Sequence, residues 1–175
     1  QELEGDDATV LDSGKTLARI YGERDLLISE CLRHSIWKGM DAPALAAMAA
    51  ALVYEARRDE EFESRMPKGN FVDYAEKTVD MWWQLESLSK KYKLPQTEPL
   101  DFAISFAFYR WASGARLDTV LDLADLLAGD FIRWSKQVID LLDQIAQTDD
   151  KALAETAKNA VDAVKRGIVA YSYYG

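Results

Sequence analysis

The chain has 175 residues, of which 49% are hydrophobic and 29% are charged, a composition typical of a folded domain of ordinary size and not of a disordered segment. No apolar run approaches the roughly 18 residues that a membrane-spanning helix needs, so the sequence predicts no membrane protein. Its 21 basic and 30 acidic residues give a formal net charge of -9, which argues against autonomous nucleic-acid binding because a negative domain repels phosphates.

Reactive side chains are few. The single cysteine, Cys31, has no second cysteine with which to form a disulfide, so we expect a reducing compartment and assign the protein to the cytoplasm. Cys31 and the single histidine, His34, lie three residues apart, on one face of a helix. Because a zinc site would need carboxylates as its other ligands, and two isolated ligands are far more often structural, we expect no metal site.

The first residues are polar and acidic. Residues 1–13 lack the basic and apolar regions of a signal peptide, and we expect them to be an acidic end segment of a longer protein. Residues 13–16 (Ser-Gly-Lys-Thr) end like a phosphate-binding loop, but Thr9 stands where that motif requires glycine, and no buried strand precedes it. We therefore expect no ATP site here, and a single helical domain over residues 14–175.

Helical spacing of apolar residues begins near residue 23. The first helix is expected to end near Gly39, since glycine is common directly after a helix. A second helix is expected next, with Asp41 as its N-cap, Pro43 in its first turn and an alanine-rich helical segment at residues 44–57. Residues 58–69 are highly charged and contain proline and glycine, which predicts a charged loop.

A long amphipathic helix should follow, capped by Asn70. Its apolar stripe has the spacing of a core helix and consists of Phe71, Ala75, Val79, Trp82, Leu85, Leu88 and Tyr92. After a loop at residues 93–99, an aromatic-rich helix is expected at 101–113, with Gly114 as its terminator.

Three further helices complete the predicted fold. A short helix spans about 117–123 and a longer one about 127–147, and the final helix, capped by Thr148 or Asp149, runs to about Ala170. No strand alternation, internal repeat or low-complexity tract competes with these elements. The sequence predicts an all-α fold, a helical bundle of about seven helices.

Residues 116–146 resemble a helix-turn-helix in outline, with a short helix, a tight turn and a longer helix. The apolar face of the longer helix consists of Phe131, Trp134, Val138, Leu142 and Ile145. Its opposite face is a polar stripe of Asp130, Arg133, Gln137, Asp140 and Gln144. One arginine between two aspartates is a poor reader of the DNA major groove.

Two interpretations of this polar stripe remain open. A row of amides and mixed charges can contact single-stranded bases and sugars through hydrogen bonds that do not hold tightly. The other interpretation, which composition alone favours, is an ordinary solvated face of a core helix. The sequence contains no nucleophile elbow and no catalytic triad, so nothing in it specifies catalysis.

Five segments, taken in order, carry a family resemblance. They are residues 20–27, 51–57, 109–115 (Tyr-Arg-Trp-Ala-Ser-Gly-Ala), 128–133 (Ala-Gly-Asp-Phe-Ile-Arg) and 165–169 (Lys-Arg-Gly-Ile-Val). Together they resemble the DSHCT domain, which ends the superkiller-type DExH-box RNA helicases, including the actinobacterial HelY-like proteins. The resemblance covers about residues 14–174.

Within these segments four residues have a physical interpretation of their own. Trp111 should be a large core anchor and Gly114 a left-handed helix terminator. Gly129 should be a small residue at a tight turn, and Arg166 a cation near the C-terminus of the final helix, where the helix dipole favours positive charge.

The resemblance implies a bundle that packs on two RecA-like motor domains of the same protein. Those domains would carry ATP hydrolysis and hold ATP and Mg, and no cofactor is expected in the present residues. It also implies that the 127–147 helix is a ratchet-type helix whose exposed face meets single-stranded RNA. In that comparison Arg133 keeps a basic position and Asp140 an acidic one, whereas Gln137 stands where related helicases often carry arginine.

The last segment departs from the usual family pattern. Gly167 replaces an aspartate, and residues 171–174 (Tyr-Ser-Tyr-Tyr) replace Ser-Leu-Tyr-Leu. We interpret both differences as packing variants.

The leading hypothesis is a non-catalytic accessory domain that guides single-stranded RNA while a larger helicase unwinds it in an ATP-driven reaction. The alternative is a helical protein-interaction module whose aromatic and alanine-rich faces dock partner proteins. A third hypothesis, a helix-turn-helix DNA regulator, predicts salt-dependent duplex binding, which the net charge of -9 opposes.

Overall fold

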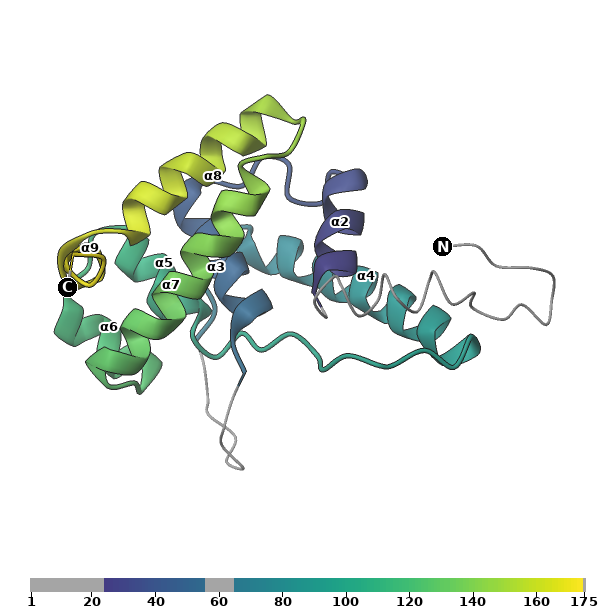
Figure 1. The fold of residues 1–175 in the computed structure, drawn as a ribbon, viewed down its shortest axis with the longest axis horizontal. Coiled ribbons are helices and arrows are strands. Elements are labelled where there is room, and N and C mark those ends of the chain that lie inside the picture. The colour runs from purple at the N-terminus through teal and green to yellow at the C-terminus, as the bar shows by residue number, and fades with distance from the viewer. Residues whose placement is uncertain (1–23, 56–64, 175) are drawn as a thin grey trace. The chain divides into compact units, whose positions relative to one another are not determined.

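The computed structural model describes residues 24–55 and 65–174. In these residues the chain forms eight helices and no strand, which confirms the predicted all-α class (Figure 1). The helices are α2 (Asp25–Arg33), α3 (Ala42–Val53), α4 (Phe71–Lys91), α5 (Ser105–Ala112), α6 (Leu117–Ala124), α7 (Ala128–Ile145), α8 (Lys151–Val164) and α9 (Gly167–Tyr171). The predicted segment 1–13, the fragment 13–16 and residues 58–64 of the predicted loop lie outside the described residues.

The described residues form two compact units. The first contains residues 24–36 and 76–99, and therefore α2, most of α4 and the loop after it. The second contains α3, the first turn of α4, and α5 to α9. The expectation of one helical domain over residues 14–175 stays a prediction.

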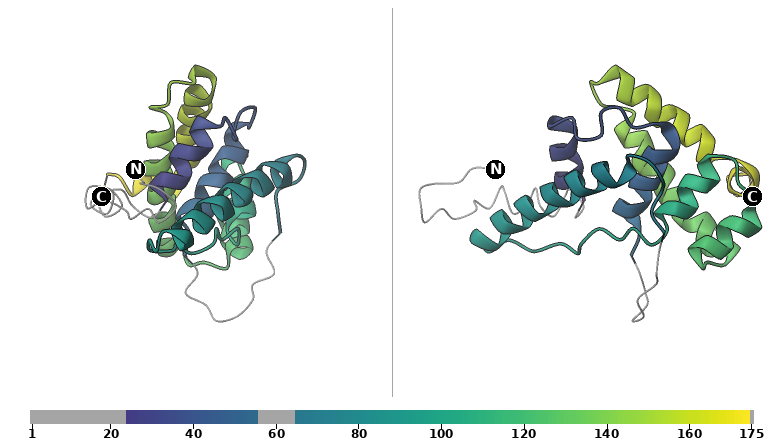
Figure 2. Two further views of the ribbon diagram at one scale, coloured as in Figure 1. Left: turned by 90° about the vertical axis from the view of Figure 1, so that its right-hand side faces the viewer. Right: turned by 180° about the vertical axis from the view of Figure 1, so that it is seen from behind.

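Helix α3 is the centre of the second unit and contacts α5, α7 and α8 (Figure 2). All residues from Ala44 to Leu52 are buried. The small alanine side chains allow the neighbouring helices to approach α3 closely, so the alanines have a packing role besides their helix propensity. Asp41 caps this helix as predicted, because its carboxylate accepts a hydrogen bond of 2.9 Å from the Ala44 N–H.

Helix α3 ends at Val53, earlier than the predicted 57. Tyr54 leaves the helix in an extended conformation, with φ -71° and ψ 135°. Its ring then packs edge-on against Trp134, at a centroid distance of 5.1 Å. The contact with a residue 80 positions away is not visible in local sequence, which explains why the predicted end was wrong.

The predicted end of the first helix near Gly39 was also wrong. Helix α2 ends at Arg33, and turns occupy residues 34–39. Gly39 has a φ of +89°, and a Cβ atom there would lie 2.9 Å from the Tyr74 hydroxyl oxygen. That hydroxyl donates to the Lys38 carbonyl at 3.0 Å. Glycine is therefore needed at this position for a tight turn against Tyr74, not for a helix end.

Helix α4 begins where predicted, since the Asn70 carbonyl accepts from the N–H groups of Asp73 and Tyr74. In the predicted stripe Phe71, Ala75 and Trp82 are buried and Val79, Leu85 and Tyr92 are half-buried. Leu88, by contrast, is 51% exposed. The apolar stripe of this helix is therefore less buried toward the C-terminal end of the helix.

Helix α5 begins at Ser105, later than the predicted 101. The Asp101 carboxylate accepts a hydrogen bond of 2.9 Å from the Ala103 N–H. This bond stabilises a local turn at residues 101–103, so the helix begins after it. The buried Ser105 hydroxyl donates to the Ala47 carbonyl at 2.9 Å, which ties α5 to α3. Gly114 has a φ of +99°, as expected for a left-handed helix terminator.

The final predicted helix is divided into α8 and α9, so the described residues form eight helices where about seven were expected for the chain. The cap of α8 is Asp150, whose carboxylate accepts from the Leu153 N–H at 3.2 Å, and not Thr148 or Asp149. Lys165 and Arg166 separate the two helices, and Gly167, the first residue of α9, adopts a left-handed φ of +51°. An L-residue side chain disfavours that conformation, so glycine at this position permits the break.

Candidate nucleic-acid interface

The predicted helix-turn-helix-like segment is formed by α6 and α7. Asp125 joins them in the left-handed conformation, with φ 51° and ψ 49°. Gly129 lies in the first turn of α7, where an added Cβ atom would meet nothing within 4 Å. The turn therefore depends on Asp125, and the expected role of Gly129 in it was wrong. Aspartate tolerates this conformation better than most residues.

The apolar face of α7 is fully buried. All five predicted core residues have an exposure of 8% or less, namely Phe131, Trp134, Val138, Leu142 and Ile145. Phe131 lies between Phe108 and Trp111, with ring centroids 5.2 and 5.3 Å away. Because the buried face fixes the rotation of the helix, the opposite face is held toward solvent.

On that face Arg133, Gln137, Asp140 and Gln144 are exposed and Asp130 is half-buried. The Arg133 guanidinium lies 3.5 Å from a carboxylate oxygen of Asp130 and 5.2 Å from the centroid of the Trp134 ring. The side chains of Arg133 and Asp130 are 45% and 50% exposed, so this ion pair is weak and water-accessible. The geometry leaves Arg133 available to a ligand.

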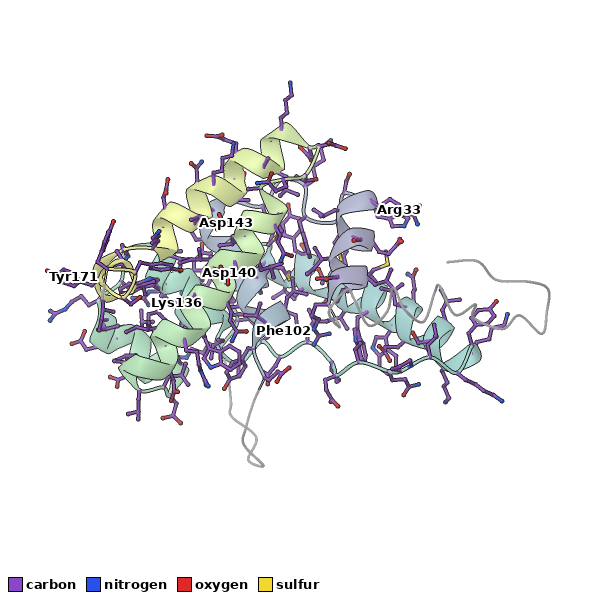
Figure 3. The ribbon with its side chains drawn as sticks, viewed as in Figure 1. Arg33, Phe102, Lys136, Asp140, Asp143 and Tyr171 are labelled. Atoms are coloured by element: carbon purple, nitrogen blue, oxygen red, sulfur yellow. The ribbon has the colours of Figure 1, made fainter. Side chains whose placement is uncertain are left out.

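Two residues missed by the sequence interpretation extend this face. Lys136 follows Arg133 by three positions and Asp143 follows Asp140 by three, so both share the stripe's helical spacing (Figure 3). The spacing alone could have identified them. The Lys136 ammonium donates to the Ser172 carbonyl at 3.4 Å and lies 5.0 Å from the Tyr173 ring centroid.

Tyr173 brings the C-terminal residues against α7. Burial raises the pKa of its phenol, and the nearby carboxylates of Asp140 and Asp143 raise that pKa further. A second cation, Lys165, lies 4.2 Å from the centroid of the same ring. Lys165, Ser172 and Tyr173 therefore lie beside the polar stripe, although they come at least 21 positions after its last residue, Gln144.

Arg166 holds this region in place. Its guanidinium donates to the Trp111 carbonyl at 3.1 and 2.7 Å and to the Ala115 carbonyl at 2.6 Å. Trp111 is 2% exposed, as expected of a core anchor, and its indole N–H donates to the Val164 carbonyl at 2.8 Å. Arg166 was expected near the end of the final helix, but its polar contacts are with the C-terminal end of α5, where a cation is also favoured.

The tyrosines of the last turn do not pack into the core as expected. Tyr171 is 82% exposed and Tyr174 is 87% exposed, whereas Tyr173 is 39% exposed. Figure 3 shows the side chain of Tyr171 directed away from the helices. The interpretation of residues 171–174 as packing variants was wrong for Tyr171 and Tyr174.

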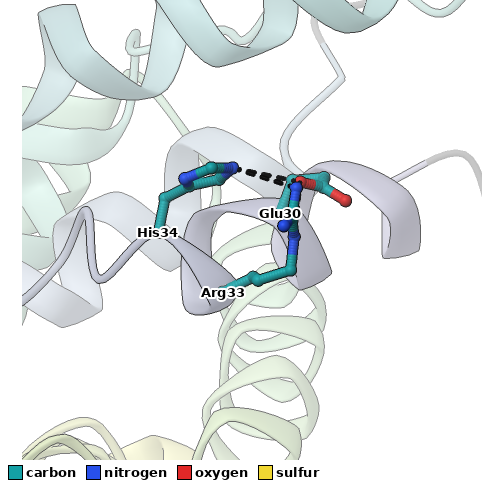
Figure 4. A network of polar contacts seen from close by, with 3 residues as sticks. All are labelled: Glu30, Arg33 and His34. Carbon is teal, nitrogen blue, oxygen red and sulfur yellow. Dashed lines mark hydrogen bonds and ion pairs between the residues drawn. The ribbon is translucent and has the colours of Figure 1, made fainter.

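A separate cluster lies on α2 in the first unit (Figure 4). Arg33 donates to Glu30 at 2.8 and 3.1 Å, and the His34 ring lies 3.4 Å from the same carboxylate. Burial, followed by the charge of Glu30, raises the pKa of the Cys31 thiol to about 12. In the described parts of the chain, no three His, Cys, Asp or Glu side chains are grouped so that they could hold a metal ion.

Within residues 24–55 and 65–174, no helix is both long enough and apolar enough to cross a membrane.

The fold and the geometry of α7 define a class of protein: an all-helical domain that presents one polar helix face beside its C-terminal turn. The family of DSHCT (NUC185) domains matches residues 7–172. The chain belongs to this family.

Similar proteins are helicases by name. The "Probable helicase HelY" of Mycobacterium leprae (strain TN) is 36% identical over an alignment of 177 positions that covers 94% of this chain and 19% of the relative. The protein of the same name from Mycobacterium tuberculosis (strain ATCC 25618 / H37Rv) is 37% identical with the same coverage. The "DExH-box ATP-dependent RNA helicase DExH15 chloroplastic" of Arabidopsis thaliana is 28% identical over 159 residues, or 87% of this chain and 14% of the relative. The chain thus spans about a fifth of the HelY relatives.

Proposed function

We propose that this chain is a non-catalytic accessory domain of a larger ATP-dependent RNA helicase. In that protein it packs on two RecA-like motor domains, which hold ATP and Mg. Helix α7 lies along single-stranded RNA through Asp130, Arg133, Gln137, Asp140 and Gln144. Support comes from the family and from relatives named as helicases, one of them as an ATP-dependent RNA helicase.

The observation that carries the RNA role is the composition of the exposed α7 face. It offers one arginine, two amides and carboxylates instead of a continuous basic strip. Amides and hydrogen-bonding carboxylates can contact bases and ribose hydroxyls, while a single cation limits the strength of phosphate binding. Such a surface suits an RNA strand that moves along it during unwinding, because none of its contacts binds the strand tightly.

The test uses the helicase that contains this chain. Arg133→Ala combined with Gln137→Ala removes the central cation and amide of the face. We expect slower unwinding of a duplex with a single-stranded RNA tail and weaker stimulation of ATP hydrolysis by RNA. Hydrolysis without RNA should stay unchanged, because the motor domains are untouched.

A matched control replaces a cation and an amide on another exposed surface, Lys158→Ala with Asn159→Ala on α8. The helicase with these two control substitutions should unwind RNA at the same rate as the unsubstituted helicase. If both pairs unwind at the parental rate, α7 does not guide the strand and the surface is an ordinary solvated face.

A further inference from the structure

We propose that the C-terminal turn is a stacking platform for the bases of single-stranded RNA, with two lysines as its phosphate contacts. The platform consists of Tyr171, Tyr173, Tyr174, Lys136 and Lys165. The inference rests on the proposed function and deepens it, because it gives the strand that lies on α7 a second point of attachment.

The backbone of the last turn places two tyrosines next to each other. The Ser172 N–H donates to the Ile168 carbonyl at 3.1 Å, and the Tyr174 N–H donates to the Tyr171 carbonyl at 3.1 Å. In such a helical turn, residues three positions apart are neighbours on the surface. Tyr171 and Tyr174 are also the most exposed large hydrophobic side chains of the described chain, at 82% and 87%. They offer two adjacent aromatic faces on which bases can stack.

The charges beside these rings suit a polyanion. The ammonium groups of Lys136 and Lys165 lie 5.0 and 4.2 Å from the centroid of the Tyr173 ring. Two cations at one ring make the local electrostatic potential more positive, which attracts an anion. Alternation of aromatic rings and cations is the arrangement that binds single strands without sequence preference. A phosphate at the lysines would bring the adjacent bases to the tyrosines.

The charged side chains around the platform indicate where the RNA backbone would cross it. Lys136 follows Arg133 of the α7 stripe by three positions, so the platform continues the proposed RNA face. Asp140 and Asp143 approach Tyr173 from the following turns of α7 and are seen along that helix in Figure 3. Because carboxylates repel phosphates, the RNA backbone should cross at the two lysines and not at these aspartates.

Binding of a short fluorescein-labelled oligouridylate to the chain, measured by fluorescence anisotropy, tests the platform. Tyr171→Ala with Tyr174→Ala should weaken binding by about tenfold or more, because each stacked base contributes strongly to affinity. Tyr171→Phe with Tyr174→Phe keeps the rings and should bind within about twofold of the parent. Lys136→Gln with Lys165→Gln should lower the salt dependence of binding, by about 1.4 in the slope of log affinity against log salt concentration.

Trp83→Ala is the control for loss of an exposed aromatic ring elsewhere, since Trp83 is 60% exposed and lies on α4. It should bind like the parent, and circular dichroism should show that all variants remain helical. The platform is excluded if the parent binds no oligouridylate at low salt. It is also excluded if the tyrosine-to-alanine pair binds like the parent, or if the phenylalanine pair loses as much affinity as the alanine pair.

One outcome would assign the tyrosines to a protein partner instead. In that case the alanine pair would keep its RNA affinity but lose binding to the motor domains added as a separate protein, and the platform would be rejected. Failure of the platform is distinct from failure of the proposed function, which depends on unwinding by the Arg133→Ala and Gln137→Ala variant.

Discussion

The guanidinium carbon of Arg166 lies 3.5 Å from the centroid of the Trp111 ring, and the same guanidinium donates to the Trp111 carbonyl. Trp111 in turn donates from its indole nitrogen to the Val164 carbonyl at the end of α8. Two residues 55 positions apart thus join the C-terminal ends of α5 and α8. This connection determines where the C-terminal turn lies.

Arg166→Ala should lower the free energy of unfolding by about 2–4 kcal/mol, because it removes charge-assisted hydrogen bonds to two carbonyls and a cation–π contact. Arg166→Lys should recover only part of this loss, since an ammonium cannot donate in the planar fork of a guanidinium. Urea denaturation followed by circular dichroism measures both. Arg116→Ala is the control, because that side chain is 86% exposed and should contribute less than about 0.5 kcal/mol. Equal losses for Arg166→Ala and Arg116→Ala would contradict this role.

Gly167→Ala should destabilise the protein by about 1 kcal/mol, since alanine disfavours the left-handed φ of +51°. An added Cβ atom would lie 3.4 Å from the Trp111 ring, which is close to ordinary contact, so strain and not collision is the main cost. Gly167→Asn should cost less, because asparagine tolerates this conformation. The ranking in urea denaturation is the test, and an alanine variant as stable as the parent would refute the backbone argument.

Ala47→Leu should destabilise the protein by about 2 kcal/mol or more. Ala47 is completely buried in the central helix α3, and extra carbon atoms there must displace α5, α7 or α8. Ala152→Leu places the same side chain on an exposed site of α8 and should change stability by less than about 0.5 kcal/mol. Thermal unfolding of the two variants should differ clearly, and similar midpoints would mean that α3 is not tightly enclosed.

The thiol of Cys31 should react with a disulfide reagent at neutral pH at least about a hundredfold more slowly than it does in the unfolded chain, because it is buried and protonated. Burial raises its pKa from 9.0 to about 12. A pKa that is higher in the folded state favours folding at low pH, and this contribution disappears as the pH rises from about 9 to about 12. The parent should therefore lose more stability than Cys31→Ala over that pH window, as measured by urea denaturation. The same pH dependence for both proteins would exclude the buried thiol as its cause.

Part of the candidate site could be predicted from local spacing. The five buried residues and five polar residues of α7 follow the helical period, and burial of one face exposes the other. Tyr173, Lys165 and Arg166 could not be added to it from the sequence. Their positions depend on the break at Gly167 and on hydrogen bonds to Trp111 and Ala115, more than 50 residues earlier in the chain.

The sequence by itself determined the all-α class, the Asp41 cap, the Gly114 terminator and the two faces of α7. These features depend on residues within a turn or two of one another, where spacing and side-chain type decide the energy. The tertiary structure decided which helix is central, where α3 ends and how the C-terminal turn meets Lys136. Those features depend on which distant surfaces fit together, as in the contacts of Tyr54 with Trp134 and of Arg166 with Trp111. Packing energy between segments far apart in the chain has no signature in the local pattern of either one.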